Sequence, residues 1–97
     1  MPTYIVLTKF TDQGVRNIKE SPKRAEAFRK VCEKLGGRVK DLYWTMGRYD
    51  VVATVEAPDD VTMNAMIYSA ASLGNVRTET LRASTAQEMS QAIAKMA

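Results

Sequence analysis

The order of elements in this chain can be worked out from one stretch, MGRYDVVATVEAPDD, residues 46–60. Gly47 stands at the first of two loop positions, which is typical of a tight hairpin turn. Residues 49–56 follow as YDVVATVE, which is rich in β-branched side chains and predicts a strand. Asp59 or Asp60 then fits the N-cap of a helix. The stretch therefore predicts a hairpin, a strand and a helix in succession.

Similar patterns on both sides complete the chain. The expected elements are strand 3–10, a short helical turn after Thr11, a helix from Ser21-Pro22 to Gly36 or Gly37, strand 38–46, strand 49–56, a helix from about residue 61 to 73, strand 75–84 and a last helix over 85–97. Ser21 is expected to cap its helix, and Thr85 with Glu88 has capping-box spacing. The order predicts an α+β, ferredoxin-like βαββαβ fold, which is a four-stranded antiparallel sheet with helices on one face, plus a C-terminal helix. We expect a single domain over residues 1–97.

Two elements are more apolar than a monomer of this fold requires. In strand 3–10, Ile5 and Leu7 alternate with Tyr4 and Val6, so both faces of the strand are apolar. The helix expected over 61–73 has no charged residue, which indicates that more than its sheet-facing side is covered. We therefore expect a homodimer or higher homo-oligomer that forms through the sheet face, as a dimeric α/β-barrel-like assembly.

Composition excludes several classes of chemistry. Histidine is absent and Cys32 is the only cysteine. Ser-His-Asp and Cys-His catalysis, histidine-ligated haem and the usual zinc sites are thereby excluded, and we expect no cofactor and no metal. Cys32 has no partner for a disulfide and fits a small buried apolar residue. No apolar run approaches the roughly 18 residues of a membrane helix, and no signal-peptide pattern is present, so a cytoplasmic location is expected.

Two segments resemble the GYD domain family of small bacterial proteins. They are GRYDVVATVEAPDD, residues 47–60, and SPKRAEAFRKVCEKLGG, residues 21–37. The family signature corresponds to Gly47, Tyr49 and Asp50, with one arginine inserted after the glycine. The resemblance covers nearly the whole chain. It implies a ferredoxin-like fold related to dimeric α/β-barrel proteins, and it implies no particular reaction.

Polar residues around the hairpin are the candidates for a site. The side chains that we expect near a cavity at the sheet face or subunit interface are Lys9, Tyr43, Thr45, Tyr49, Asp50 and Thr78. The favoured hypothesis is that this cavity binds an unidentified small molecule, and that Tyr4, Met63 and Met66 also line it. Strand alternation places Trp44 on the opposite face from Tyr43.

Two further interpretations remain for Asp50. It could act as the general base of a cofactor-independent enzyme, with Tyr49 or Tyr43 as hydrogen-bond donor. The structural interpretation is that an aspartate beside a tight turn accepts backbone N–H groups, while Tyr49 fills a subunit interface.

The charge distribution raises single-stranded RNA as a last alternative partner. Residues 16–48 have a net charge of +6 and residues 49–97 a net charge of −3. RNA-recognition modules share this topology and stack bases on sheet aromatics. Val51 and Thr54 stand where those aromatics belong, and Asp50 would repel phosphate. The simpler explanation is a solvated basic helix face that complements an acidic region of a neighbouring subunit.

Overall fold

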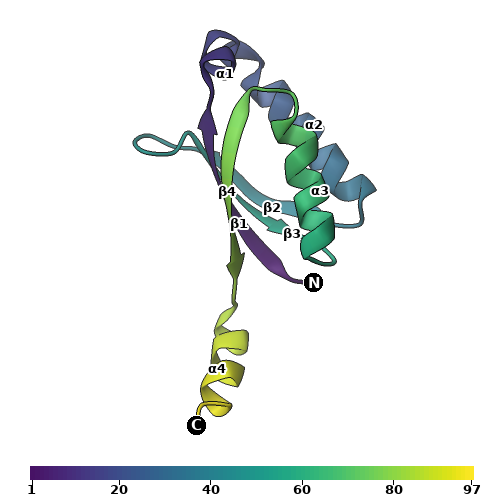
Figure 1. The fold of residues 1–97 in the computed structure, drawn as a ribbon, viewed down its shortest axis with the longest axis vertical. Helices are drawn as coiled ribbons and strands as arrows, with labels where there is room; N and C mark the ends of the chain where they lie inside the picture. The colour runs from purple at the N-terminus through teal and green to yellow at the C-terminus, as the bar shows by residue number, and fades with distance from the viewer.

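The structure is a computed structural model that describes all residues from Met1 to Ala97 (Figure 1). Its strands are β1 (Thr3–Phe10), β2 (Arg38–Trp44), β3 (Val51–Glu56) and β4 (Val76–Ala83). Its helices are α1 (Asp12–Arg16), the 3-10 helix η1 (Ile18–Glu20), α2 (Ser21–Lys34), α3 (Asp60–Ala71) and α4 (Ala86–Ala94). None of the helices is long and apolar enough to cross a membrane.

The four strands form one antiparallel sheet in the order β2-β3-β1-β4. In β1, Tyr4 pairs with Val55 of β3 on one side and with Arg82 of β4 on the other. The helices α2 and α3 lie side by side on one face of this sheet (Figure 1). This is the split βαβ arrangement of the ferredoxin-like fold, so the predicted fold class is confirmed.

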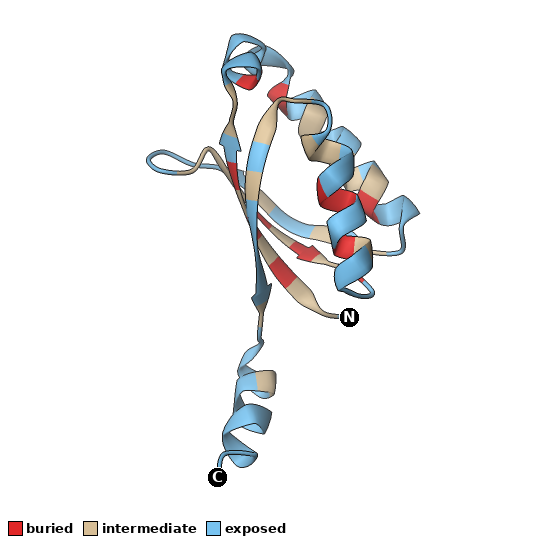
Figure 2. Cartoon of the chain, viewed as in Figure 1, coloured by how far each residue is buried: buried red, intermediate tan, exposed pale blue.

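The hydrophobic core lies between the sheet and these two helices. It consists of nine buried residues, which are Tyr4, Val6, Cys32, Ala53, Val55, Ala57, Met63, Met66 and Ile67. Figure 2 shows buried segments, in red, on the strands of the sheet and on the helices α2 and α3. The other side of the sheet, the open face, is covered by no helix. Strand alternation and the strand register place Ile5, Leu7, Tyr43, Val52 and Leu81 on the open face.

The ends of the helices follow local sequence signals. At the end of α2, Gly36 has φ +88°, and the N–H groups of Gly36 and Gly37 donate to the carbonyls of Glu33 and Cys32. These two bonds form a Schellman motif, which favours glycine because the backbone is left-handed there. Asp59 caps α3 by accepting the Thr62 N–H. The predicted capping box between Thr85 and Glu88 is present at the start of α4.

Two local predictions are wrong. Residues 45–50 form a six-residue loop between β2 and β3, in place of a two-residue turn, and Gly47 has φ +96° in it. Ser21 does not cap α2, because it is itself helical. Its hydroxyl instead accepts a hydrogen bond of 2.9 Å from the Trp44 indole. This contact joins the start of α2 to the end of β2, which no local pattern could reveal.

The C-terminal helix α4 projects away from the rest of the molecule (Figure 1). It continues beyond the end of β4, and the molecule measures 51 Å along its longest axis and 18 Å along its shortest. The helix therefore does not cover the open face of its own sheet.

Candidate functional site

A shallow depression on the open face gathers two of the candidate residues, Lys9 and Tyr49. It is lined by Leu7, Lys9, Tyr49, Arg77, Thr78 and Glu79, which come from β1, β4 and the hairpin loop. Thr78 borders it, but its register partner Thr8 places the Thr78 side chain on the helix side of the sheet. The Lys9 ammonium lies 5.6 Å from the centre of the Tyr49 ring. The Tyr49 hydroxyl donates to Glu79 Oε1 at 3.3 Å. Tyr49 thus connects the loop to the edge strand β4 across the face.

The depression carries an excess of positive charge. Lys9 and Arg77 are directly opposite one another on β1 and β4. Neither of them forms an ion pair, since the three ion pairs of the chain are Lys23–Glu20, Arg38–Glu56 and Arg82–Asp60. Like charges directly opposite on neighbouring strands are destabilising. A carboxylate or another anion placed here would relieve that repulsion.

Asp50 holds the hairpin loop against β1, and Thr45 joins the two ends of the loop. The Asp50 carboxylate accepts the Phe10 N–H at 2.8 Å, and the Asp50 N–H donates to the Thr8 carbonyl at 2.8 Å. The Thr45 N–H donates to the Asp50 carbonyl at 2.9 Å, and the Thr45 hydroxyl donates to the Tyr49 carbonyl at 2.6 Å. Each of these polar groups therefore has a backbone partner, as expected for a structural anchor.

The other expected lining residues do not share one cavity. Tyr43 is exposed on the open face. Tyr4, Met63 and Met66 are buried between the sheet and the helices, on the opposite side of the sheet. A single cavity lined by Tyr43, Tyr49 and these three core residues is therefore wrong, because the sheet itself separates the two groups.

Tyr4 and Cys32 are the core residues with clearly altered ionisation. Burial raises the pKa of the Tyr4 hydroxyl, and the hydrogen bond that it donates to Asp60 raises this pKa further. The Arg82 guanidinium lies 5.5 Å from the centre of the Tyr4 ring. Burial raises the pKa of the Cys32 thiol to about 12. At neutral pH both groups are uncharged, and Cys32 has no thiolate with which to react.

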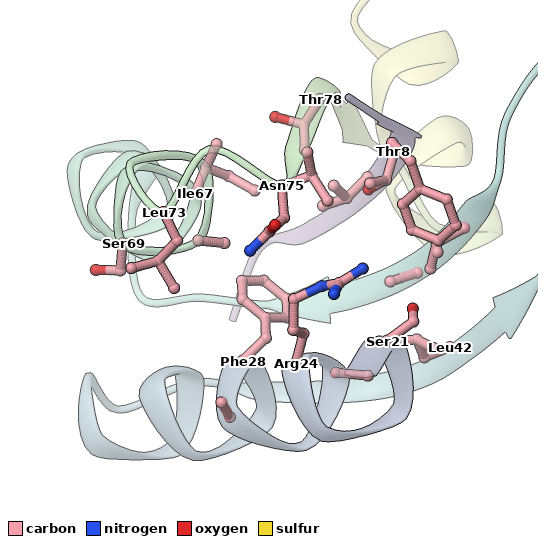
Figure 3. A pocket seen from close by; sticks show the side chains of 18 of the residues that line it. Thr8, Ser21, Arg24, Phe28, Leu42, Ile67, Ser69, Leu73, Asn75 and Thr78 are labelled. Carbon is pink, nitrogen blue, oxygen red and sulfur yellow. The ribbon is translucent and has the colours of Figure 1, made fainter. Parts of the chain in front are cut away.

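A second hollow, between the sheet and the helices α2 and α3, was not predicted from the sequence. It has a cavity volume of about 180 Å³ and is mainly apolar. Figure 3 shows Phe28 and Arg24 of α2 facing Ile67 of α3, Leu73 just after the end of α3, and Thr8 of β1 across it. Trp44 also lines this cavity, on the opposite side of the sheet from Tyr43 as predicted.

Polar contacts close one end of this cavity. The Arg24 guanidinium donates to the Asn17 carbonyl at 2.8 Å and to the Gly14 carbonyl at 3.3 Å, and it lies 5.8 Å from the centre of the Phe10 ring. Ala25, Phe28 and Val31 of α2 recur at helical spacing and line this hollow, and this periodicity was the one usable signal for it in the sequence. It could not reveal the hollow itself, because that depends on how far apart α2 and α3 pack.

Comparisons with known proteins agree with this fold. A Thermus thermophilus protein named "Glutamine synthetase and cystathionine beta-lyase binding protein" is 39% identical over 84 residues, which are 86% of this chain and 88% of that protein. The crystal structure of TTHA0845, also from Thermus thermophilus, is 30% identical, with a TM-score of 0.57 over 89% of this chain and 96% of that chain. The hypothetical protein PHS023 from Pyrococcus horikoshii shares the fold, with 21% identity and a TM-score of 0.55 over 88% of this chain and 92% of that chain.

The family comparison covers the whole body of the fold. The model of the GYD domain family matches residues 4–93, which include all of the sheet except Thr3, the helices α2 and α3 and the hairpin loop. A match over almost the entire chain shows that the protein belongs to the GYD domain family.

Proposed function

We propose that this protein is a small binding protein that associates with copies of itself through the open face and recognises a metabolic enzyme as its protein partner. The observation that carries the proposal is the apolar centre of the open face. Ile5, Leu7 and Val52 lie there side by side on β1 and β3, and no element of the chain covers them. These three side chains are partly exposed, and contiguous apolar surface that the chain leaves uncovered marks an interaction site on a small protein.

The relative from Thermus thermophilus supports the choice of partner. Its name states that it binds glutamine synthetase and cystathionine beta-lyase, and it is 39% identical to this chain. The charged rim of the open face, with Lys9 and Arg77 unpaired, would give such an association its orientation, because polar rims surround apolar interface centres.

Two measurements test the proposal. The first is the mass of the purified protein by sedimentation equilibrium, for which we expect a dimer or a larger assembly. The second is binding to purified glutamine synthetase and cystathionine beta-lyase from the same organism, followed by biolayer interferometry. Leu7→Lys places a charge in the centre of the open face and should weaken self-association at least about 100-fold.

The control for this variant is Met46→Lys. Met46 is 98% exposed at the tip of the hairpin loop, so the same added charge should leave the mass unchanged. A monomeric wild-type protein, or equal masses for the two variants, would refute assembly through the open face. If neither enzyme binds at micromolar concentration, the enzyme-binding part of the proposal is wrong.

A second candidate function is small-molecule binding, and the cavity between the sheet and the helices favours it. Its volume of about 180 Å³ and its largely apolar lining suit a small apolar ligand with one polar end. The depression at Lys9 and Tyr49 is the other candidate ligand site, and it suits a small anion. Native mass spectrometry of the protein isolated from its own cell would report any retained ligand.

The two ligand sites can be told apart by variants. Ala70→Leu fills the cavity from α3, while Lys9→Ala changes only the depression. Because Trp44 lines the cavity, a ligand there should shift the Trp44 emission, and Ala70→Leu should abolish the shift. Catalysis by Asp50 and Tyr49 has less support, because the carboxylate and the hydroxyl already have protein partners.

A further inference from the structure

The helix α4 has an apolar stripe that nothing in its own chain covers. Met89 and Ile93 lie one turn apart on α4, and Met96 follows just beyond the end of the helix at the same helical spacing, with Ala92 between Met89 and Ile93. Each of the three large side chains is more than half exposed. Figure 2 shows almost all of α4 in the exposed colour, well apart from the sheet and the other helices.

A helix of this length needs a packing partner. The helix α4 has nine residues, and isolated helices shorter than about 12 residues are only marginally stable in water. The capping box of Thr85 and Glu88 fixes where α4 begins, and it contributes roughly 1 kcal/mol. That contribution does not replace tertiary packing. The stripe is therefore the surface of α4 that is suited to such packing.

The exposed surface of the whole chain is larger than that of a compact monomer. The chain exposes 6633 Å², and a folded monomer of 10.8 kDa exposes about 5,500 Å². The excess is thus about 1,100 Å², while each partner in a standard protein interface contributes about 800 Å². The chain therefore carries enough surplus surface for one stable interface with a second molecule.

The geometry favours a second copy of this chain over the chain's own sheet. Only Ser84 and Thr85 separate β4 from α4, and Thr85 is held in an extended conformation by the capping box. The helix consequently leaves the end of β4 pointing away from its own domain (Figure 1). The stripe needs an apolar surface on which to pack. The open face of a second copy provides such a surface at its centre, where Ile5, Leu7 and Val52 lie.

We propose that α4 is an arm that packs, through Met89, Ile93 and Met96, on the open face of a second copy of this chain. Two chains related by a twofold axis would exchange their arms reciprocally, which closes the assembly as a dimer. This inference rests on the proposed self-association through the open face, and it identifies α4 as the segment that covers that face.

The experiment compares two double variants of the full chain. Met89→Ser with Ile93→Ser removes the centre of the stripe, and Gln87→Ser with Gln91→Ser introduces the same residue type on the opposite side of α4. Serine replaces both pairs, so any intrinsic weakening of the helix is similar. Sedimentation equilibrium gives the dimer dissociation constant, and circular dichroism at 222 nm reports the helix content.

The stripe variant should raise the dimer dissociation constant at least about 100-fold, because two large apolar side chains lose their buried environment. The glutamine variant should stay within about threefold of the wild-type protein, since surface substitutions have small effects. The stripe variant should also lose helix content, because α4 no longer packs.

Each of the other outcomes would contradict a specific part of the proposal. Equal dissociation constants for the two double variants would overturn the arm, even if Leu7→Lys disrupts the dimer and the sheet-face association stands. Disruption by the stripe variant but not by Leu7→Lys would overturn docking on the open face. A monomeric wild-type protein would overturn both the arm and the sheet-face association.

Discussion

Asp50 was a candidate general base, but its hydrogen bonds in the structure are those of a residue that holds the hairpin loop in place. Its carboxylate accepts the Phe10 N–H at 2.8 Å. We expect Asp50→Ala to lower the free energy of unfolding by about 1–2 kcal/mol, because the Phe10 N–H loses its acceptor. Asp50→Asn keeps an acceptor oxygen and should cost less. Urea denaturation measures both changes.

The control for this prediction is Asp41→Ala. Asp41 is exposed and makes no side-chain hydrogen bond, so its removal should change the free energy of unfolding by less than about 0.5 kcal/mol. A loss at Asp50 no larger than the loss at Asp41 would show that the contact with β1 does not hold the loop.

The buried thiol of Cys32 should lower the stability of the folded protein at alkaline pH. Burial, with a smaller effect from the Glu33 carboxylate, raises its pKa from 9.0 to about 12. The folded pKa therefore lies above the unfolded one, and the stability that the thiol contributes is full below about pH 9 and is lost as the pH rises toward 12. We expect the free energy of unfolding to fall less between pH 9 and 11 in Cys32→Ala than in the wild-type protein.

Tyr4 contributes a similar alkaline loss in both proteins, because its pKa is raised as well. Urea denaturation of the two proteins at matched pH values therefore isolates the effect of the thiol. Parallel curves of stability against pH would mean that the Cys32 thiol ionises in the folded protein as it does in the unfolded chain.

At the scale of the helices and strands, the sequence correctly predicted the features that depend on residues close together in the chain. The strands, the helix end at Gly36 and the capping box at Thr85 follow from local periodicity and capping residues. The hairpin was predicted too short, because the Asp50 N–H bonds to β1 and draws residues 45–50 into a loop. That bond joins segments far apart in the sequence, and no local pattern encodes it.

The helix α1 shows the same dependence on a distant segment. The Thr11 N–H donates to the Asn75 carbonyl at 3.0 Å, and a Cβ atom on Gly14 would overlap the oxygen of that carbonyl. We expect Gly14→Ala to lower the free energy of unfolding by about 1–3 kcal/mol, since backbone must move to make room. Urea denaturation measures the loss.

Val15→Ala is the neighbouring control on α1. Val15 is more than half exposed, so its truncation should cost little. Similar losses for the two variants would mean that α1 tolerates displacement from the loop at Asn75, and the close approach would then have no energetic role.

At the scale of the whole molecule, the sequence indicated an uncovered face of the sheet more clearly than it indicated which residues share a binding site. The apolar residues on both faces of β1 predicted an uncovered face, and Leu7 and Ile5 do lie on a face that no helix covers. The candidate residues were predicted as one group, yet Tyr49 and Met63 lie on opposite sides of the sheet. Which polar and apolar groups share a hollow is set by packing in three dimensions, and periodicity along one strand does not contain it.

The uncovered open face should make the thermal stability of the protein depend on its concentration. Only nine hydrophobic residues form the core, so an isolated chain has little to offset the loss of conformational entropy. If the dimer is the folded unit, the melting temperature should rise with protein concentration, because mass action favours the assembled state. A tenfold increase in concentration should raise the melting temperature by about 3 °C for a dimer of two such chains.

Differential scanning calorimetry over a hundredfold concentration range measures this dependence. Leu7→Lys should melt at a lower temperature that no longer changes with concentration, since its open face cannot pair. Met46→Lys should keep the wild-type slope. A melting temperature of the wild-type protein that is constant over the whole range would show that the chain folds and melts as a monomer, and that its own core suffices for stability without a second copy.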